Sequence, residues 1–373
     1  MNKIKSMMLV MLTIIACATF TACGSDDDNN NGNNNGNNQS NYDKYQQAVN
    51  NIVNTQKSSN KVILVVALGS TWEQAYDTFD KVVSDYKAQF PGWDVFLSFS
   101  SAICINNARA GENVAPRDYY DPEHFLTAIG LAGYKQIAVQ SLQVIPGEEY
   151  RRVRDSYVKD FMNNRDGDFT TDYMHSIDKQ VVVGVPLMGE DQDVAKLATT
   201  LVQESDIRSF IDNGSIIAFM GHGNPENYDY FGANIRYSEL EIALQTMYPR
   251  FFVGTVDMED NYVADVIMRA KALGFTKGDV QLFPLMSIAG DHAHNDMCVD
   301  WVDAFEAAGY EVEAYETLFT EPCWSKHKSG EEYIPGLAER SKVRALWIQH
   351  TKDAIAKLGT DEALSTPTTS TEE

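Results

Sequence analysis

The chain has 373 residues, of which 44% are apolar, and it carries a formal net charge of -23 with a pI near 4.6. A chain of this length can bury one large or two medium hydrophobic cores. Its acidity is unsuited to binding a phosphate backbone, which requires a basic surface. The composition therefore predicts a folded protein that does not bind nucleic acid.

The N-terminus has the features of an export signal. Lys3 and Lys5 precede an apolar run at 7–20, which is shorter than a membrane span and is followed by small residues before Cys23. This ending is similar to a bacterial lipobox, in which the cysteine becomes the lipidated first residue. We therefore expect residues 1–23 to be a signal peptide, and the protein to be exported and held by a lipid anchor at Cys23 in the outer membrane. The alternative is a plain secretory signal that is cut elsewhere.

Two segments have too few apolar residues to fold. Residues 24–60 begin with an Asn- and Asp-rich stretch that we expect to be a disordered tether, followed by a lead-in helix at 42–56. The Thr- and Glu-rich tail at 359–373 is expected to be disordered as well. The folded part therefore lies between about 61 and 358.

Three cysteines remain in that part, at positions 104, 298 and 323. An odd number in an exported protein allows at most one disulfide and leaves a free thiol. The chain has no Cys-x-x-Cys pair, so the sequence does not indicate a structural zinc or iron–sulfur site.

Strand and helix patterns alternate from residue 61 onward. Continuous apolar runs predict buried strands at 61–68, 93–99, 136–144 and 181–187. Helical patterns follow them at 72–90, 122–133, 150–161 and 191–213, the last with a break near Ser205. This alternation predicts an α/β domain at 61–212 whose parallel sheet is covered on both faces.

Residues 213–358 repeat the plan of the first domain. The run at 216–223 corresponds to that at 63–70, and the motif at 142–148 matches 285–291 at one constant offset. A repeat of this length indicates two similar doubly wound domains that face each other across a cleft, not a solenoid of short units.

Metal-binding residue types follow three strands of the second domain. His222 lies between two glycines directly after the run at 216–221, Asp257 follows the run at 253–256, and His292 follows the run at 280–286. We expect the next helix only from near Val299. Ligands of open α/β sheets bind at the carboxyl ends of the strands, and imidazole and carboxylate groups bind divalent metals or transfer protons. The sequence predicts an open metal or acid–base site at these three residues.

Other polar residues near the strand ends have two interpretations each. His294 could share the side of an extended segment with His292, or line the cleft wall. Glu148 and Glu149 could add carboxylates to the cleft from the first domain, or cap the helix that follows them. The remaining histidines are expected at the surface or at helix ends, namely His124, His175, His327 and His350.

Taken together, the motifs resemble those of the anaerobic sirohydrochlorin cobalt chelatases, ATP-independent class II chelatases related to ferrochelatase. The resemblance covers about residues 61–358 in one register. It rests on five motifs: ILVVALGS at 63–70, QSLQVIPGEEY at 140–150, MGHG at 220–223, VGTV at 253–256 and AGDHAHNDM at 289–297.

The resemblance implies that a tetrapyrrole lies in the cleft, where two histidines and a glutamate bind the metal and accept the pyrrole protons. By position these are His222 and His292, with Asp257 at the glutamate position and Glu259 as its possible substitute. The residues expected to contact the substrate are Gly69, Ser70, Glu148, Glu149, Gly223, Asp291 and His294, with an apolar wall from Met220, Phe283, Met286 and Trp324.

The activity that the resemblance implies is insertion of Co²⁺, or of Fe²⁺, into sirohydrochlorin or a related ring without ATP. The lack of a GxxxxGK[ST] phosphate loop agrees with this. Because sirohydrochlorin is made in the cytoplasm, export suggests two alternatives. The protein could bind haem and remove its iron, or only bind haem or metal.

Overall fold

The computed structural model describes residues 40–111, 116–315, 317–318 and 332–364. Residues from Asn41 onward form a single unit. Of the helices in these ranges, none combines the length and the apolar composition that a membrane span requires. The predicted signal peptide and most of the tether and the tail lie outside the described residues, as do Cys23, Cys323, Trp324 and His327.

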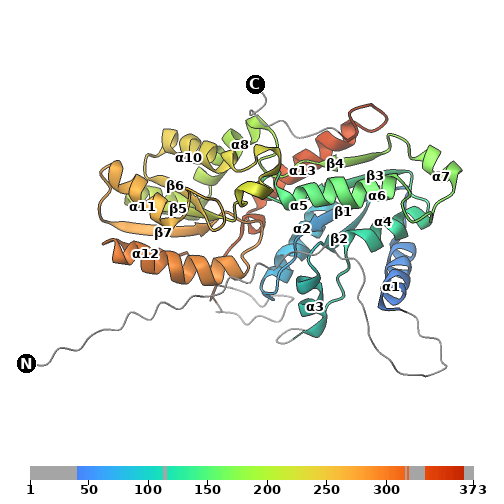
Figure 1. Ribbon diagram of the computed structural model, residues 1–373, viewed down its shortest axis with the longest axis horizontal. Helices are drawn as coiled ribbons and strands as arrows, with labels where there is room; N and C mark the ends of the chain where they lie inside the picture. The colour runs from blue at the N-terminus through green and yellow to red at the C-terminus, as the bar shows by residue number, and fades with distance from the viewer. Residues whose placement is uncertain (1–39, 112–115, 316, 319–331, 365–373) are drawn as a thin grey trace, which may run out of the picture. The chain divides into compact units, whose positions relative to one another are not determined.

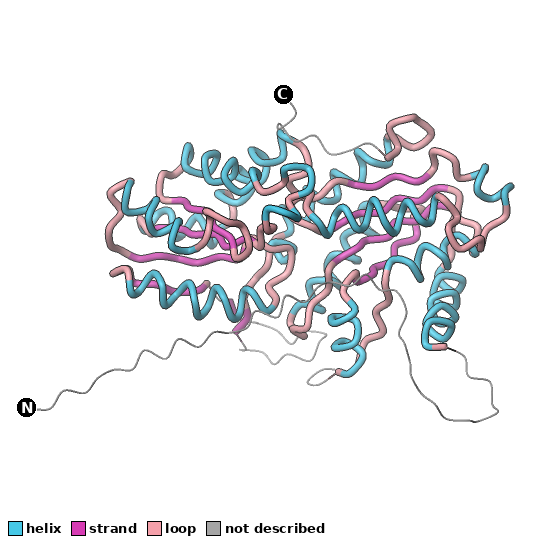
Figure 2. The backbone as a smooth tube through the Cα atoms, in the orientation of Figure 1, coloured by secondary structure: helices cyan, strands magenta, loops and turns pink. Residues whose placement is uncertain are grey.

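Two parallel sheets of four strands form the framework (Figure 2). In the first half of the chain the order is β2 (Asp94–Phe99), β1 (Lys61–Ala67), β3 (Gln136–Ser141), β4 (Val181–Gly184). In the second half it is β6 (Phe251–Thr255), β5 (Ile216–Gly221), β7 (Asp279–Pro284), β8 (Glu311–Ala314). A short antiparallel pair, β9 (Thr317–Leu318) and β10 (Glu332–Tyr333), follows. The prediction of two similar doubly wound α/β units is confirmed, because both sheets have the same order and direction.

Both faces of each sheet are buried. On β5, Ile217 and Phe219 belong to one apolar cluster, whereas Ile216, Ala218 and Met220 belong to another on the opposite face. Helices α10 and α12 lie on opposite sides of this sheet in Figure 1. Continuous apolar strands are what a sheet covered on both faces requires.

Most helices of the first half agree with the sequence patterns. The lead-in helix and the break near Ser205 are confirmed, whereas two helices were not predicted: α3, which begins after the capping side chain of Ser101, and the short α7. Strands β3 and β4 end before 144 and 187, because the apolar residues that follow them pack into the core from loops. The helices are α1 (Asn41–Gln56), α2 (Ala75–Gln89), α3 (Ala102–Ala110), α4 (Pro122–Leu131), α5 (Glu148–Arg151), the π-helical η1 (Arg152–Val158), α6 (Lys159–Met162), α7 (Thr171–Ser176), α8 (Asp191–Val202) and α9 (Ser205–Asn213).

In the second half, the helix after β7 begins seven residues earlier than the sequence pattern indicated. It starts at His292, not near Val299, because Ala293, Met297 and Trp301 recur at every fourth position and all three are buried. The helical elements here are the short η2 (Glu226–Tyr228) and η3 (Tyr230–Gly232), α10 (Ile235–Met247), α11 (Val263–Ala272), the π-helical η4 (His292–Trp301), α12 (Val302–Ala307), the short η5 (Leu337–Glu339) and α13 (Ser341–Ala356).

The C-terminal helix returns to the first half of the chain. The repeat in the sequence predicts that residues 341–356 belong to the second domain, yet α13 packs against β3, β4, α8 and α2. Trp347, which is 1% exposed, donates its indole N–H to the carbonyl of Gln143 at 3.1 Å. In the opposite direction, helix α9 of the first half packs against β5 of the second half.

The sequence predicted His350 at the surface or at a helix end, and this prediction is wrong. His350 is buried in the middle of α13. Its Nε2 lies 3.2 Å from Oδ2 of Asp193, and its Nδ1 lies 3.2 Å from the carbonyl oxygen of Val185. Of the other histidines, His124 and His175 do lie at the ends of α4 and α7. His350 therefore connects α13 to α8 and to the loop that follows β4.

We predict that His350→Ala destabilises the fold by about 3 kcal/mol, because it leaves the carboxylate of Asp193, 2% exposed, without its buried partner. Burial alone would raise the pKa of Asp193, but its hydrogen bond to His350 and the charge of that ring lower it overall. The contribution of this carboxylate is therefore full above the pKa of an unfolded aspartate, about 4, and is lost as the pH falls through the lower folded value.

Urea unfolding at several pH values measures this effect. His175→Ala, at an exposed position on α7, is the control and is expected to be neutral. Equal unfolding free energies for the native chain and His350→Ala at neutral pH would contradict the role of the pair.

Candidate functional site

His222 is presented by a turn that only glycine allows on either side. A Cβ on Gly221 would lie 2.3 Å from the ring of Tyr237. Gly223 has a φ of +78°, and a Cβ there would lie 2.8 Å from that of Met258. The two glycines therefore allow a tight turn directly after β5. The side chain of His222 in this turn is 50% exposed.

Both site histidines are oriented through Nδ1. In His222 this atom lies 2.7 Å from the carbonyl oxygen of Gly223, and in His292 it lies 2.6 Å from Oδ2 of Asp296. A carbonyl or carboxylate oxygen accepts hydrogen bonds, so Nδ1 carries the proton in each neutral ring and Nε2 holds the lone pair. The two rings meet edge to face with centroids 4.8 Å apart. The two imidazoles therefore lie side by side, and each has an unprotonated Nε2 in its neutral form.

Asp257 is the carboxylate that accompanies this pair. Its Oδ2 lies 3.6 Å from Nε2 of His222, whereas Glu259 is exposed. The backbone N–H of Asp257 donates to the carbonyl of His222 at 2.9 Å, which fixes the two loops against each other. Among the described residues, no group of three or more His, Cys, Asp or Glu side chains is placed to hold a metal ion, and this includes the predicted set of His222, Asp257 and His292. The side chains of these three residues are between 43% and 50% exposed.

The two glutamates of the first half differ in environment. Glu148 forms an ion pair with Arg151 at 3.1 Å in the first turn of α5. Burial raises the pKa of the Glu149 carboxyl, while the charges of Arg152 and His222 act in the opposite direction. The Oε2 atom of Glu149 is buried and has no hydrogen-bond partner among the described residues. Of the two glutamates, Glu149 is therefore the one whose carboxyl is more easily protonated, and it lies close enough to His222 to be affected by its charge.

Asp291 and His294 contact the first half of the chain. Asp291 accepts hydrogen bonds from the indole N–H of Trp72 at 2.6 Å and from the hydroxyl of Thr71 at 3.2 Å. The ring of His294 stacks on Trp72 with centroids 3.6 Å apart, and burial lowers the pKa of His294. We call the three residues Trp72, Asp291 and His294 the clasp.

The structure rules out one of the two interpretations of His294, that it shares one side of an extended segment with His292. Both residues are in a helical segment, where positions two apart point in different directions. Trp72 was missed because the sequence pattern placed it at the start of a helix. The sequence feature that could have identified Trp72 is its position, since it is an aromatic residue directly after the strand-end motif Gly69-Ser70-Thr71.

Several predicted substrate contacts are internal instead. Gly69 has a φ of +104° and packs against Cys104, where a Cβ would lie 2.6 Å from the cysteine Cβ. Ser70 is 4% exposed and accepts a hydrogen bond from the backbone of Trp72. Met220 and Phe283, predicted as cleft wall, are buried in the core because strand positions inside a covered sheet face helices. Met286 is half-buried.

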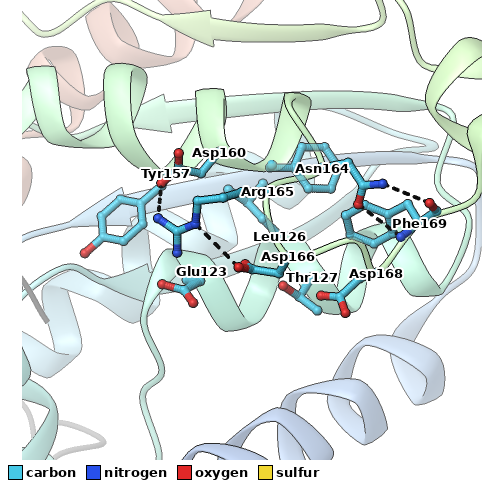
Figure 3. Close-up of a pocket in the computed structure, with 11 residues that line it drawn as sticks. Glu123, Leu126, Thr127, Tyr157, Asp160, Asn164, Arg165, Asp166, Asp168 and Phe169 are labelled. Carbon is cyan, nitrogen blue, oxygen red and sulfur yellow. Dashed lines mark hydrogen bonds and ion pairs between the residues drawn. The ribbon is translucent and has the colours of Figure 1, made fainter. Parts of the chain in front are cut away.

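A small pocket in the first half is separate from these residues (Figure 3). Its volume of about 30 Å³ holds little more than a water molecule. Arg165 pairs with Asp160 at 2.6 Å and with Asp166 at 3.4 Å inside it. Its size excludes an organic ligand. A larger cavity, of about 600 Å³, is lined by residues of β7, β8 and η4 and does not include His222, Asp257 or His292.

The whole α/β region of the chain, residues 61–356, matches the family model described as cobalt chelatase (CbiK). The chain belongs to this family. The sirohydrochlorin cobaltochelatase of Salmonella typhimurium strain LT2 is 26% identical over 305 residues, 79% of this chain and 96% of the relative. The sirohydrochlorin cobaltochelatase CbiKC of Nitratidesulfovibrio vulgaris strain Hildenborough is 27% identical over 303 residues, 80% of this chain and 92% of the relative.

A solved structure shares the fold. The structure of SirB from Bacillus subtilis with Fe³⁺ has a TM-score of 0.50 at 12% identity and covers 83% of this chain and 99% of SirB. The resemblance drawn from the motifs is thus confirmed at the level of the family, whose members are metal chelatases.

We predict that the clasp stabilises the contact between the two halves. Trp72→Phe keeps the stack on His294 but removes the indole N–H, so it should lower the free energy of unfolding by about 1 kcal/mol. Trp72→Ala removes both contacts and should cost about 2 kcal/mol. Urea unfolding measures both, with His175→Ala, at an exposed position on α7, as control. If Phe and Ala at position 72 behave like the control, the clasp has no energetic role.

Proposed function

We propose that the protein inserts a divalent metal, Co²⁺ or Fe²⁺, into a tetrapyrrole of the sirohydrochlorin type without ATP. The observation that carries the proposal is the pair of imidazoles of His222 and His292, which meet edge to face beside the carboxylate of Asp257. Family membership and the activity named for the two curated relatives support it.

The metal is a substrate that must be bound briefly and passed on. Neutral imidazole nitrogen binds borderline metals such as Co²⁺ and Fe²⁺. The hydrogen bond from His292 to Asp296 orients the ring and fixes the tautomer in which Nε2 is free to bind the metal. Asp257 partly neutralises the charge of the incoming ion. An open, half-exposed site suits this task, because a closed cage would retain the metal.

Insertion also releases two protons from the pyrrole nitrogens. An imidazole that is not holding the metal can accept one of them. Glu149 can accept another, since burial raises its pKa toward the working pH. The metal exchanges water ligands for ring nitrogens, and no bond that needs a nucleotide is made or broken. The absence of a GxxxxGK[ST] motif supports independence from ATP.

Export and lipid attachment through Cys23 complete the proposal, supported by the N-terminal sequence. The alternatives of removing iron from haem, or of only binding haem or metal, stay predictions of the sequence. They would use the same two imidazoles.

We predict that His222→Ala and His292→Ala each reduce the rate of metal insertion by about 100-fold or more, because each removes a metal-binding nitrogen and a proton acceptor. The change in ring absorbance on adding Co²⁺ or Fe²⁺ measures insertion. His175→Ala serves as the control. Asp296→Asn should lower the rate by about 10-fold while preserving the fold. Glu149→Gln should remove the rise in rate as the pH passes above the usual carboxyl range. Full activity of both His→Ala variants would refute the assignment.

We predict that Cys23→Ser moves the protein from the membrane to the soluble fraction, because the thiol is the lipid acceptor. Fractionation and mass spectrometry of the mature N-terminus measure this. Cys17→Ser, in the same predicted signal peptide, is the matched control and should remain in the membrane fraction. If Cys23→Ser is retained like the control, the lipobox interpretation is wrong.

A further inference from the structure

The loop that follows His222 contacts the segment of the first half that carries Glu149. This loop, residues 223–234, connects β5 to α10, and the contacted segment, residues 147–151, follows β3 and includes α5. In the proposed function, His222 and Glu149 act on one ring from opposite halves of the chain. The contacts between the loop and the segment therefore determine how these two groups lie relative to each other.

Asn224 packs directly on Gly147. A Cβ on Gly147 would lie 2.7 Å from Nδ2 and 2.8 Å from Oδ1 of Asn224. Gly147 has a φ of -88°, so no left-handed backbone conformation requires glycine at this position. Glycine is needed here because the side chain of Asn224 occupies the space that a Cβ would take.

A second asparagine, Asn234, holds Asn224 in place. The buried Oδ1 of Asn234 accepts the backbone N–H of Asn224 at 2.9 Å and its side-chain Nδ2–H at 3.2 Å. The Nδ2 of Asn234 donates to the carbonyl of Asn224 at 2.6 Å. The backbone N–H of Asn234 donates in turn to Asp229 at 2.8 Å. The amide of Asn224 therefore cannot move away from Gly147 without losing hydrogen bonds to a buried partner.

Two aromatic contacts extend the interface between the loop and α5. The guanidinium of Arg151 lies over the ring of Tyr230 at 4.2 Å, and Phe231 meets Tyr150 edge to face with centroids 6.4 Å apart. Phe231 has a φ of +61°, which a residue with a bulky side chain rarely adopts. Such a conformation persists only where the surrounding structure imposes it. Packing against α5 thus holds the loop in place at a cost to its own backbone.

We propose that Asn224 and Asn234 are positioning residues for metal insertion, which hold Glu149 in its working position relative to the imidazole of His222. The inference rests on the proposed function and assigns two further residues to it. Neither asparagine needs to touch the ring or the metal, because Asn224 acts through Gly147, two residues before Glu149. A displacement of about 1 Å in a reacting group lowers a rate by up to about 100-fold, so a contact that fixes this position affects the rate.

Single and double substitutions at positions 147 and 224 test the inference. Gly147→Ala forces the segment away from the loop, so kcat for insertion of Co²⁺ into sirohydrochlorin should fall by about 10-fold or more. Asn224→Ala removes the support and should lower kcat by about fivefold. KM for Co²⁺ should change by less than about twofold in both, because the predicted metal-binding side chains are intact.

The double variant gives the decisive result. The methyl group of Gly147→Ala occupies the space that Asn224→Ala vacates, so the double variant should insert the metal faster than either single variant. Independent effects would instead multiply, to a loss of about 50-fold. A double variant that is no faster than Gly147→Ala overturns the inference.

Gly290→Ala is the matched control, because Gly290 is the counterpart of Gly147 in the repeat. A Cβ there would have no neighbour nearer than the Oγ of Ser70 at 3.9 Å, so kcat should be unchanged. An equal loss in Gly290→Ala would mean that any added methyl at a strand end lowers the rate, which also overturns the inference.

Asn234→Ala keeps the inference testable if Gly147→Ala does not fold. It releases Asn224 without adding bulk, so kcat should fall by about fivefold with KM for Co²⁺ unchanged. Urea unfolding shows whether the variant is folded under the assay conditions. A folded Asn234→Ala with the kcat of the native protein contradicts the role of both asparagines.

The native protein separates this inference from the proposed function. If it inserts Co²⁺ and the double variant does not recover, the positioning role fails while the chelatase function stands. If the native protein inserts no metal into the ring, the chelatase function fails. The positioning role, which rests on that function, then fails with it.

Discussion

The turn at the end of β5 is the constraint on which the site depends. Gly221 has no room for a side chain beside Tyr237, and Gly223 has none beside Met258 and also has a positive φ. This close packing holds His222 at the strand end and fixes the carbonyl that accepts its Nδ1 proton. The same backbone receives the N–H of Asp257, so the position of the carboxylate follows from the turn.

The two halves of the chain share one sheet topology but differ in the side chains at their strand ends. Both sheets have the same strand order, yet the end of β3 leads to Glu149 where the end of β7 leads to His292. One half therefore provides the two imidazoles, and the other provides a carboxyl whose burial raises its pKa. The exchanged helices α9 and α13 and the contact of Trp72 with Asp291 hold the two halves together.

The sequence by itself determined the fold class, the duplicated register and the two histidines, because continuous apolar strands and glycine-flanked strand ends are local patterns. Only the tertiary structure decided the start of the helix at His292, the role of Asp296, the stacking of Trp72 on His294 and the burial of His350 in the first half. These depend on packing between segments up to 222 residues apart, such as Trp72 and His294. The segment that begins at His292 is mostly polar, so its pattern predicts a loop. Its helix forms because Ala293, Met297 and Trp301 are buried, and the sequence alone does not show that burial.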